Sequence, residues 1–159
     1  MSKVKTNVMR ILDSNNINYN TFSYTVEKGQ HLDGVEVASR IGKNVEEVYK
    51  TLVAQGNSRN IYIYVIPVNE SLDLKKAASI SGEKSISMIN LNDINKFTGY
   101  IKGGCSPIGM KKKYKTFVNN TAQVLEEIIV SAGKIGYQVQ LSPIKLKEIT
   151  ECEFLDIVK

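Results

Sequence analysis

The sequence has little with which to build a metal site or a disulfide framework. Its 159 residues include two cysteines, Cys105 and Cys152, and one histidine, His31. The cysteines lie far apart and form no CxxC pair, so we expect neither a structural metal ion nor a set of disulfide bridges. Cys152 stands in the stretch TECEFLDIV and is expected to be a small buried core residue, as free cysteines usually are.

Long apolar runs are also missing. No stretch approaches the roughly 18 apolar residues that a membrane span needs. The start, MSKVKTNVMRIL, lacks the apolar segment and the cleavage site of a signal peptide. We therefore expect a cytoplasmic protein with no membrane partner, folded as one domain over residues 1–159. The apolar fraction of 42% suits a globular chain, and the net charge of +5 would suit a polyanionic partner without requiring one.

The spacing of apolar residues predicts an alternation of helices and strands. We expect a first helix with Thr6 as its N-cap, another that begins at Asn44, and further helices over residues 34–41, 74–80, 91–97 and 143–150. Strands are expected over residues 17–24, 50–55, 61–68 and 116–119, and on both sides of a turn at residues 133–136. Strand 61–68, IYIYVIPV, is apolar on both faces and should be central. Hairpins mixed with single helices predict an α/β domain with a curved or closed, mixed and mostly antiparallel sheet.

The segment TGYIKGGCSPIGMKKK, residues 98–113, concentrates small residues and lysines. Gly104 and Gly109 have the spacing of a phosphate-binding loop. However, Met110 and Lys111 stand where that motif needs Lys and then Ser or Thr. A G-x-S-x-G nucleophile elbow also fails, because the segment has one residue too many and a proline follows its serine. Two interpretations remain: a tight turn beside solvated lysines, or a loop whose backbone N–H groups approach a ligand and stabilise a developing oxyanion.

Lys50 opens the predicted strand KTLVA and shares one face of it with Leu52 and Ala54. Because that face should be packed, the ammonium group either reaches water at the strand end or projects into a pocket. In a pocket it could bind a phosphate, a hydroxyl or a carbonyl oxygen. Tyr24, at the end of another predicted strand, could line such a pocket.

The sequence resembles the YbaK family of aminoacyl-tRNA deacylases, relatives of the editing domain inserted in bacterial prolyl-tRNA synthetases. The resemblance rests on segments in the family's order and spacing: KTNVMRILDSNNINY, VYKTLV, LDLKKAA, TGYIKGGCSPIGMKKK and VSAGKIG. It runs almost end to end and is strongest toward the Cys-tRNA(Pro) deacylase branch. It implies a curved mixed sheet or barrel flanked by helices, and a pocket for the aminoacylated 3′ end of tRNA. It also implies no metal and no cofactor, aminoacyl-tRNA(Pro) as the substrate, and prolyl-tRNA synthetase as a partner.

The resemblance and the motifs around it define a set of expected site residues. The expected catalytic residues are Lys50, Gly103, Gly104 and Ser106. Contacts to the substrate are expected from Tyr24, Thr51, Cys105, Pro107, Gly109, Ser131, Gly133 and Gln138. Contacts to tRNA phosphates are expected from Lys111, Lys112, Lys113 and Lys134. One position departs from the pattern, because a close relative has an acidic residue where this chain has Gln138.

The mechanism that the resemblance implies needs no protein nucleophile. The cysteine attached to the tRNA attacks its own ester carbonyl through its thiol, which frees the tRNA and leaves a cyclic thioester. The protein then supplies orientation and charge stabilisation. We expect Lys50 to hold the terminal ribose or phosphate, the amides of residues 103–106 to hold the carbonyl oxygen, and Cys105 to line the pocket. Two alternatives stay open: a deacylase for another small residue, such as alanine on tRNA(Pro), and a catalytically silent tRNA-binding module, which Gln138 favours.

Overall fold

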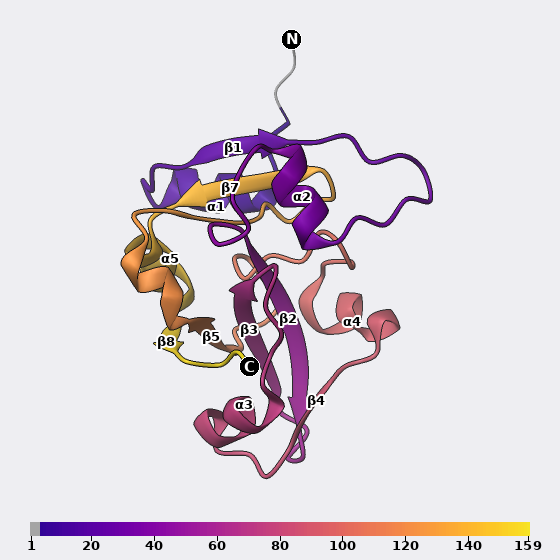
Figure 1. Ribbon diagram of the computed structural model, residues 1–159, viewed down its shortest axis with the longest axis vertical. Helices are drawn as coiled ribbons and strands as arrows, with labels where there is room; N and C mark the ends of the chain where they lie inside the picture. The colour runs from indigo at the N-terminus through magenta and orange to yellow at the C-terminus, as the bar shows by residue number, and fades with distance from the viewer. Residues whose placement is uncertain (1–3) are drawn as a thin grey trace.

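The strands of the chain form two sheets that meet near the beginning of one strand, β2 (Tyr49–Gly56; Figure 1). The computed structural model describes residues 4–159. The five-stranded sheet has the order β4 (Ile86–Met88), β2 (Tyr49–Gly56), β3 (Ile61–Pro67), β5 (Lys115–Asn119) and β8 (Glu153–Leu155). The three-stranded sheet has the order β1 (Asn20–Ser23), β7 (Tyr137–Leu141) and β6 (Ile128–Ser131). Strand β5 runs parallel to β3 and to β8, whereas the other pairs are antiparallel. The prediction of a mixed and mostly antiparallel α/β domain is confirmed.

Strand β3 is the middle strand of the larger sheet and separates two apolar clusters. Ile63 and Val65 point into the cluster shared with the first helix and the smaller sheet. Tyr62, Tyr64 and Ile66 point to the other face. Both faces are therefore buried, which explains why this strand lacks the usual alternation of apolar and polar residues. The predicted central position is confirmed.

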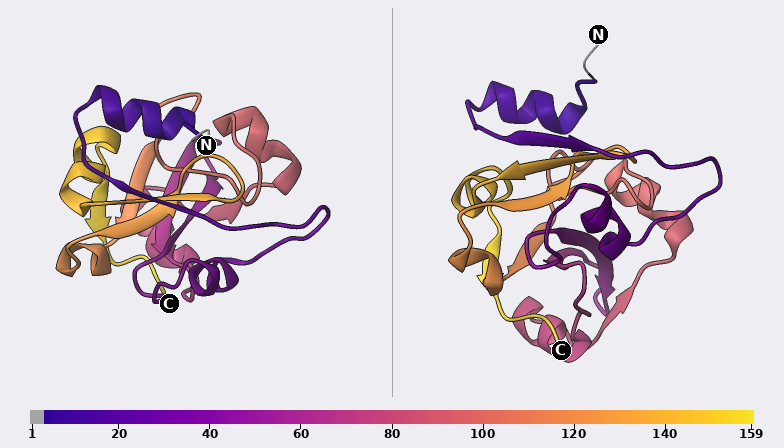
Figure 2. Two further views of the ribbon diagram at one scale, coloured as in Figure 1. Left: turned by 90° about the horizontal axis from the view of Figure 1, so that it is seen from above. Right: turned by 45° about the horizontal axis from the view of Figure 1, so that its top comes forward.

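The helices begin and end at local signals in the sequence. Thr6 caps α1 (Asn7–Ser14), where its Oγ1 accepts a hydrogen bond from Met9 N at 3.2 Å. Figure 2 shows α1 lying along the smaller sheet. The other helical segments are α2 (Gly34–Arg40), α3 (Leu74–Ser81), η1 (Leu91–Asp93), α4 (Ile94–Thr98), η2 (Asn120–Val124) and α5 (Pro143–Thr150). Within residues 4–159, no helix has the length and apolar character needed to cross a membrane.

The predicted helix that begins at Asn44 is wrong. Residues 45–47 form a single turn. Glu47 Oε2 still accepts a hydrogen bond from Asn44 N at 3.1 Å, which is the reciprocal half of a capping box. The chain cannot continue as a helix, because Val48 already forms a parallel bridge with Ile129 and β2 begins at the next residue. Long-range pairing has overridden a local helix signal.

The same bridge joins the two sheets. Ile129 N donates to Glu47 O at 2.8 Å, and Val68 N donates to Val48 O at 2.9 Å. Beyond this point β6 pairs with β7, whereas β2 continues beside β3. The two sheets therefore diverge just after Val48.

Candidate functional site

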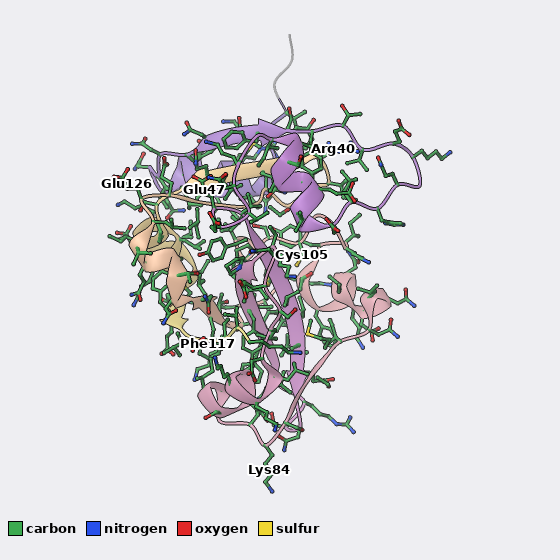
Figure 3. The ribbon with its side chains drawn as sticks, in the orientation of Figure 1. Arg40, Glu47, Lys84, Cys105, Phe117 and Glu126 are labelled. Atoms are coloured by element: carbon green, nitrogen blue, oxygen red, sulfur yellow. The ribbon has the colours of Figure 1, made fainter. Side chains whose placement is uncertain are left out.

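A cavity of about 430 Å³ lies where the two sheets diverge. Segments far apart in the chain form its walls: the end of β1, the first turn of α2, the start of β2, the loop after α4, and the facing ends of β6 and β7. In Figure 3, Cys105 of that loop lies between α2 and α4, beside the start of β2. The residues that line the cavity are Tyr24, Leu32, Asp33, Gly34, Val35, Val37, Val48, Tyr49, Lys50, Thr51, Leu52, Val68, Lys102, Gly103, Cys105, Ser131 and Gln138.

Lys50 is one of the residues that line this cavity, as expected for the second of its two orientations. It is half-buried, and Leu52 from the same face of β2 also lines the cavity. Burial lowers the pKa of Lys50 below its ordinary value, while the negative charges of Asp33 and Glu70 act in the opposite direction. A partly desolvated ammonium group binds an oxygen ligand more strongly than one in bulk water.

The loop over residues 103–109, called the glycine loop below, faces the cavity along only part of its length. Gly103 lines it and has φ of +86°, a left-handed conformation that favours glycine. Gly104 instead packs against the turn between β6 and β7, where an added Cβ would lie 3.0 Å from Ile135 N. Ser106 is fully buried, and its Oγ accepts a hydrogen bond from Ile108 N at 3.3 Å. The structure places Gly104, Ser106, Pro107, Gly109 and Gly133 outside the lining of the cavity.

Cys105 lines the cavity as a protonated thiol. Burial raises the pKa of Cys105 to about 12, and a hydrogen bond with Thr98 opposes that shift only in part. The thiolate is the reactive form of cysteine, so a thiol with this pKa is a poor nucleophile at neutral pH. The geometry therefore gives Cys105 a place on the wall of the cavity without activating it.

Another wall of the cavity is formed by β6, β7 and the end of β1, and it brings together three further expected residues. Ser131 and Gln138 are directly paired across β6 and β7, so their side chains share one face of that sheet. Tyr24 N donates to Gly136 O at 2.9 Å, which ties the end of β1 to the turn between β6 and β7. Gln138 is buried and carries no charge.

Two charged residues on the cavity wall were not among the site residues expected from the sequence. Lys102 immediately precedes the glycine pair, and Asp33 is the N-cap of α2, where its Oδ1 accepts a hydrogen bond from Glu36 N at 2.9 Å. The capping position was a readable signal for a helix start, but nothing local indicated that α2 would border the same cavity as Lys50. No group of three or more His, Cys, Asp and Glu side chains in the described part of the chain could hold a metal ion.

The lysines expected to contact tRNA are exposed. Lys111, Lys112 and Lys113 follow the glycine loop, and Lys113 forms a surface ion pair with Glu151. Lys134 lies 5.5 Å from the centre of the Tyr137 ring, on the turn that packs against Gly104. These side chains are available to a polyanion, since a surface ion pair holds a lysine only weakly.

Known proteins match both the sequence and the fold. A family model described as "Aminoacyl-tRNA editing domain" matches residues 32–149, a segment that contains every cavity-lining residue except Tyr24. An Enterococcus faecalis protein named "Putative Cys-tRNA(Pro)/Cys-tRNA(Cys) deacylase EbsC" is 42% identical over 153 residues, covering 96% of this chain and 93% of that protein. Proline–tRNA ligase of Staphylococcus aureus is 27% identical over 104 residues, which cover 65% of this chain and 18% of the ligase.

The fold has a close counterpart among solved structures. A structure titled "Crystal structure of a putative trans-editing enzyme for prolyl tRNA synthetase" superposes with a TM-score of 0.81 over 99% of both chains, at 18% identity. The agreement of fold, family model and full-length relative leads to one assignment: the chain belongs to the YbaK family of aminoacyl-tRNA editing domains.

Proposed function

We propose that this protein deacylates mischarged Cys-tRNA(Pro) in trans, with the thiol of the substrate as the nucleophile. The observation that carries the proposal is a cavity that holds a partly desolvated lysine, Lys50, but no activated nucleophile of its own. Its cysteine is a protonated thiol, and its hydroxyls from Thr51 and Ser131 have no histidine beside them among the lining residues of the described chain. The name of the Enterococcus faecalis relative supports cysteine esters as the substrate class.

The chemistry then balances without a protein nucleophile. The substrate sulfur forms a bond to its own carbonyl carbon, the bond from that carbon to the ribose oxygen breaks, and the thiol proton passes to the departing ribose oxygen. The products are free tRNA and a cyclic thioester, which water opens. In this scheme the protein lowers the barrier by holding the reacting atoms in place and by stabilising the oxyanion.

Lys50 would bind the terminal ribose or phosphate, and amides of the glycine loop would bind the carbonyl oxygen. Gly104 N already donates to Ile101 O at 3.0 Å, so it is not free for this purpose. The proposal therefore rests on the N–H groups of Gly103 and Cys105, because these two residues of the loop line the cavity. Lys111, Lys112, Lys113 and Lys134 would contact phosphates of the acceptor stem.

A second candidate is a deacylase for another small residue, such as alanine on tRNA(Pro). The cavity volume is compatible with this candidate, because about 430 Å³ is much larger than the side chain of cysteine or of alanine. The volume alone therefore does not exclude an alanine ester. A catalytically silent tRNA-binding module is the third candidate, and the uncharged Gln138 favours it. Under the leading proposal, prolyl-tRNA synthetase would be the cytoplasmic partner that supplies both the mischarged product and the tRNA identity.

One assay separates the three candidates. Purified protein is incubated with Cys-tRNA(Pro), Ala-tRNA(Pro) and Pro-tRNA(Pro), and release of each amino acid is followed against a protein-free control. Selective release of cysteine supports the leading proposal, and selective release of alanine supports the second. Binding of all three tRNAs with no release identifies the silent module.

A further inference from the structure

The main chain of Thr51 faces away from β3. In an antiparallel pair, alternate residues direct their N–H and C=O groups toward the partner strand, and the residues between them direct these groups away. Val68 N donates to Val48 O at 2.9 Å at one end of the hairpin. Gly56 N donates to Asn60 O at 2.9 Å at the other end. Even-numbered residues of β2 therefore bond to β3, and Thr51 is among the odd-numbered residues that point outward.

The outward positions on both sides of Thr51 have partners. Toward the far end of β2, Ile89 N donates to Val53 O at 3.3 Å, and β4 pairs with β2 from Ala54 onward. Toward its beginning, Ile129 N donates to Glu47 O at 2.8 Å, where β6 bridges to β2. Between these points, no strand within residues 4–159 pairs with β2 on this edge, and the gap borders the cavity.

The side chain of Thr51 also lacks a partner. Its Oγ1 is the one buried side-chain oxygen or nitrogen in residues 4–159 that makes no hydrogen bond. Folded proteins leave few such groups unsatisfied, and each one calls for a physical explanation. Thr51 thus combines a main-chain donor, a main-chain acceptor and an unsatisfied hydroxyl at one place on the cavity wall, beside Lys50.

We propose that Thr51 binds the aminoacyl ester as an open strand edge binds one added residue. The α-amino group of the substrate donates to Thr51 O and to Thr51 Oγ1, and the ester carbonyl accepts a hydrogen bond from Thr51 N. The amino group and the carbonyl oxygen of an α-aminoacyl ester have the spacing of the N–H donor and the C=O acceptor of a strand residue. One unpaired residue at a strand edge can therefore form both hydrogen bonds with the ester. The carbonyl oxygen has a second lone pair for an amide of the glycine loop. This inference rests on the proposed function and adds the recognition of the α-amino group.

Binding of an uncleavable substrate analogue tests the contact. The probes are adenosine analogues with a 3′-amide in place of the ester, one carrying L-cysteine and the other 3-mercaptopropionate, which keeps the thiol but lacks the α-amino group. Affinities are measured for the wild type, for Thr51→Val, which removes the hydroxyl at nearly constant shape, and for Thr51→Ser, which keeps it. Thermal unfolding confirms that each variant is folded.

We expect the wild type to bind the cysteinyl probe roughly tenfold more tightly than the probe without the amino group. Thr51→Val should weaken the cysteinyl probe about fivefold and the other probe less than twofold, and Thr51→Ser should follow the wild type. Equal affinity of both probes for the wild type would overturn the inference, and this comparison requires no variant. An equal effect of Thr51→Val on both probes, or no effect on either, would also overturn it.

The binding result is independent of catalysis, so the two proposals can fail separately. If the wild type binds the cysteinyl probe in an amino-dependent and hydroxyl-dependent way but releases no amino acid from tRNA, the proposed function fails and the Thr51 contact stands. If it deacylates Cys-tRNA(Pro) but binds both probes alike, the proposed function stands and the Thr51 contact fails.

Discussion

Replacing Lys50 by methionine separates the proposed role of its charge from its packing. Methionine keeps most of the apolar stem and removes the ammonium group, which is half-buried in the cavity. A charge-assisted hydrogen bond in such a place contributes about 1.5–3 kcal/mol. If that bond is made to the substrate in the transition state, Lys50→Met should lower kcat/KM for Cys-tRNA(Pro) by roughly 10- to 150-fold.

The same substitution should not destabilise the fold at neutral pH. Burial lowers the pKa of Lys50 in the folded state, so the unfolded chain binds this proton more tightly. The group therefore opposes folding below its folded-state pKa, and stability rises as the pH increases from that value toward the ordinary value of 10.5. Methionine removes this penalty, and we expect the Tm of the variant to equal or exceed that of the wild type at pH 7.

The measurement is single-turnover deacylation of Cys-tRNA(Pro), with thermal unfolding of the same preparations. Lys84→Met serves as the matched control, because Lys84 is exposed and lies at the bottom tip of the molecule, away from Cys105 near its middle (Figure 3). The control should keep the wild-type rate. A Lys50→Met protein that deacylates within twofold of the wild type would refute the role of the ammonium group. A lower Tm together with lost activity would assign Lys50 to packing.

Three further variants test other parts of the protein. Cys105→Ser should retain deacylation, since the pKa of Cys105 is raised to about 12 and its thiol is not an active nucleophile; complete loss of activity in a folded variant would contradict this. Gly104→Ala should lower the free energy of unfolding by about 1–3 kcal/mol in a denaturant titration, because its Cβ would lie 3.0 Å from Ile135 N. Replacing lysines 111–113 together by alanine should lower the slope of log affinity for tRNA against log salt by up to about 0.7–0.9 per lost phosphate contact; an unchanged slope would place the RNA elsewhere.

The local structure of this protein could be read largely from its sequence. Thr6, the apolar run IYIYVIPV and the boundaries of α5 each predicted an element that the structure contains, because caps and hydrophobic periodicity act over a few residues. The five segments that resemble the YbaK family were sufficient to indicate the family. The helix expected at Asn44 failed for a long-range reason, since pairing of Val48 with Ile129 outweighed a local capping signal.

The cavity itself depended on tertiary structure. Tyr24, Lys50, Gly103, Ser131 and Gln138 meet only because β6 leaves β2 after a single bridge, and no local pattern encodes that divergence. The packing of Gly104 against the turn between β6 and β7, which is distant in sequence, also depended on tertiary structure. Composition and spacing thus determined the elements and the chemistry available, whereas non-local strand pairing determined which groups share a cavity and which edge of β2 stays open.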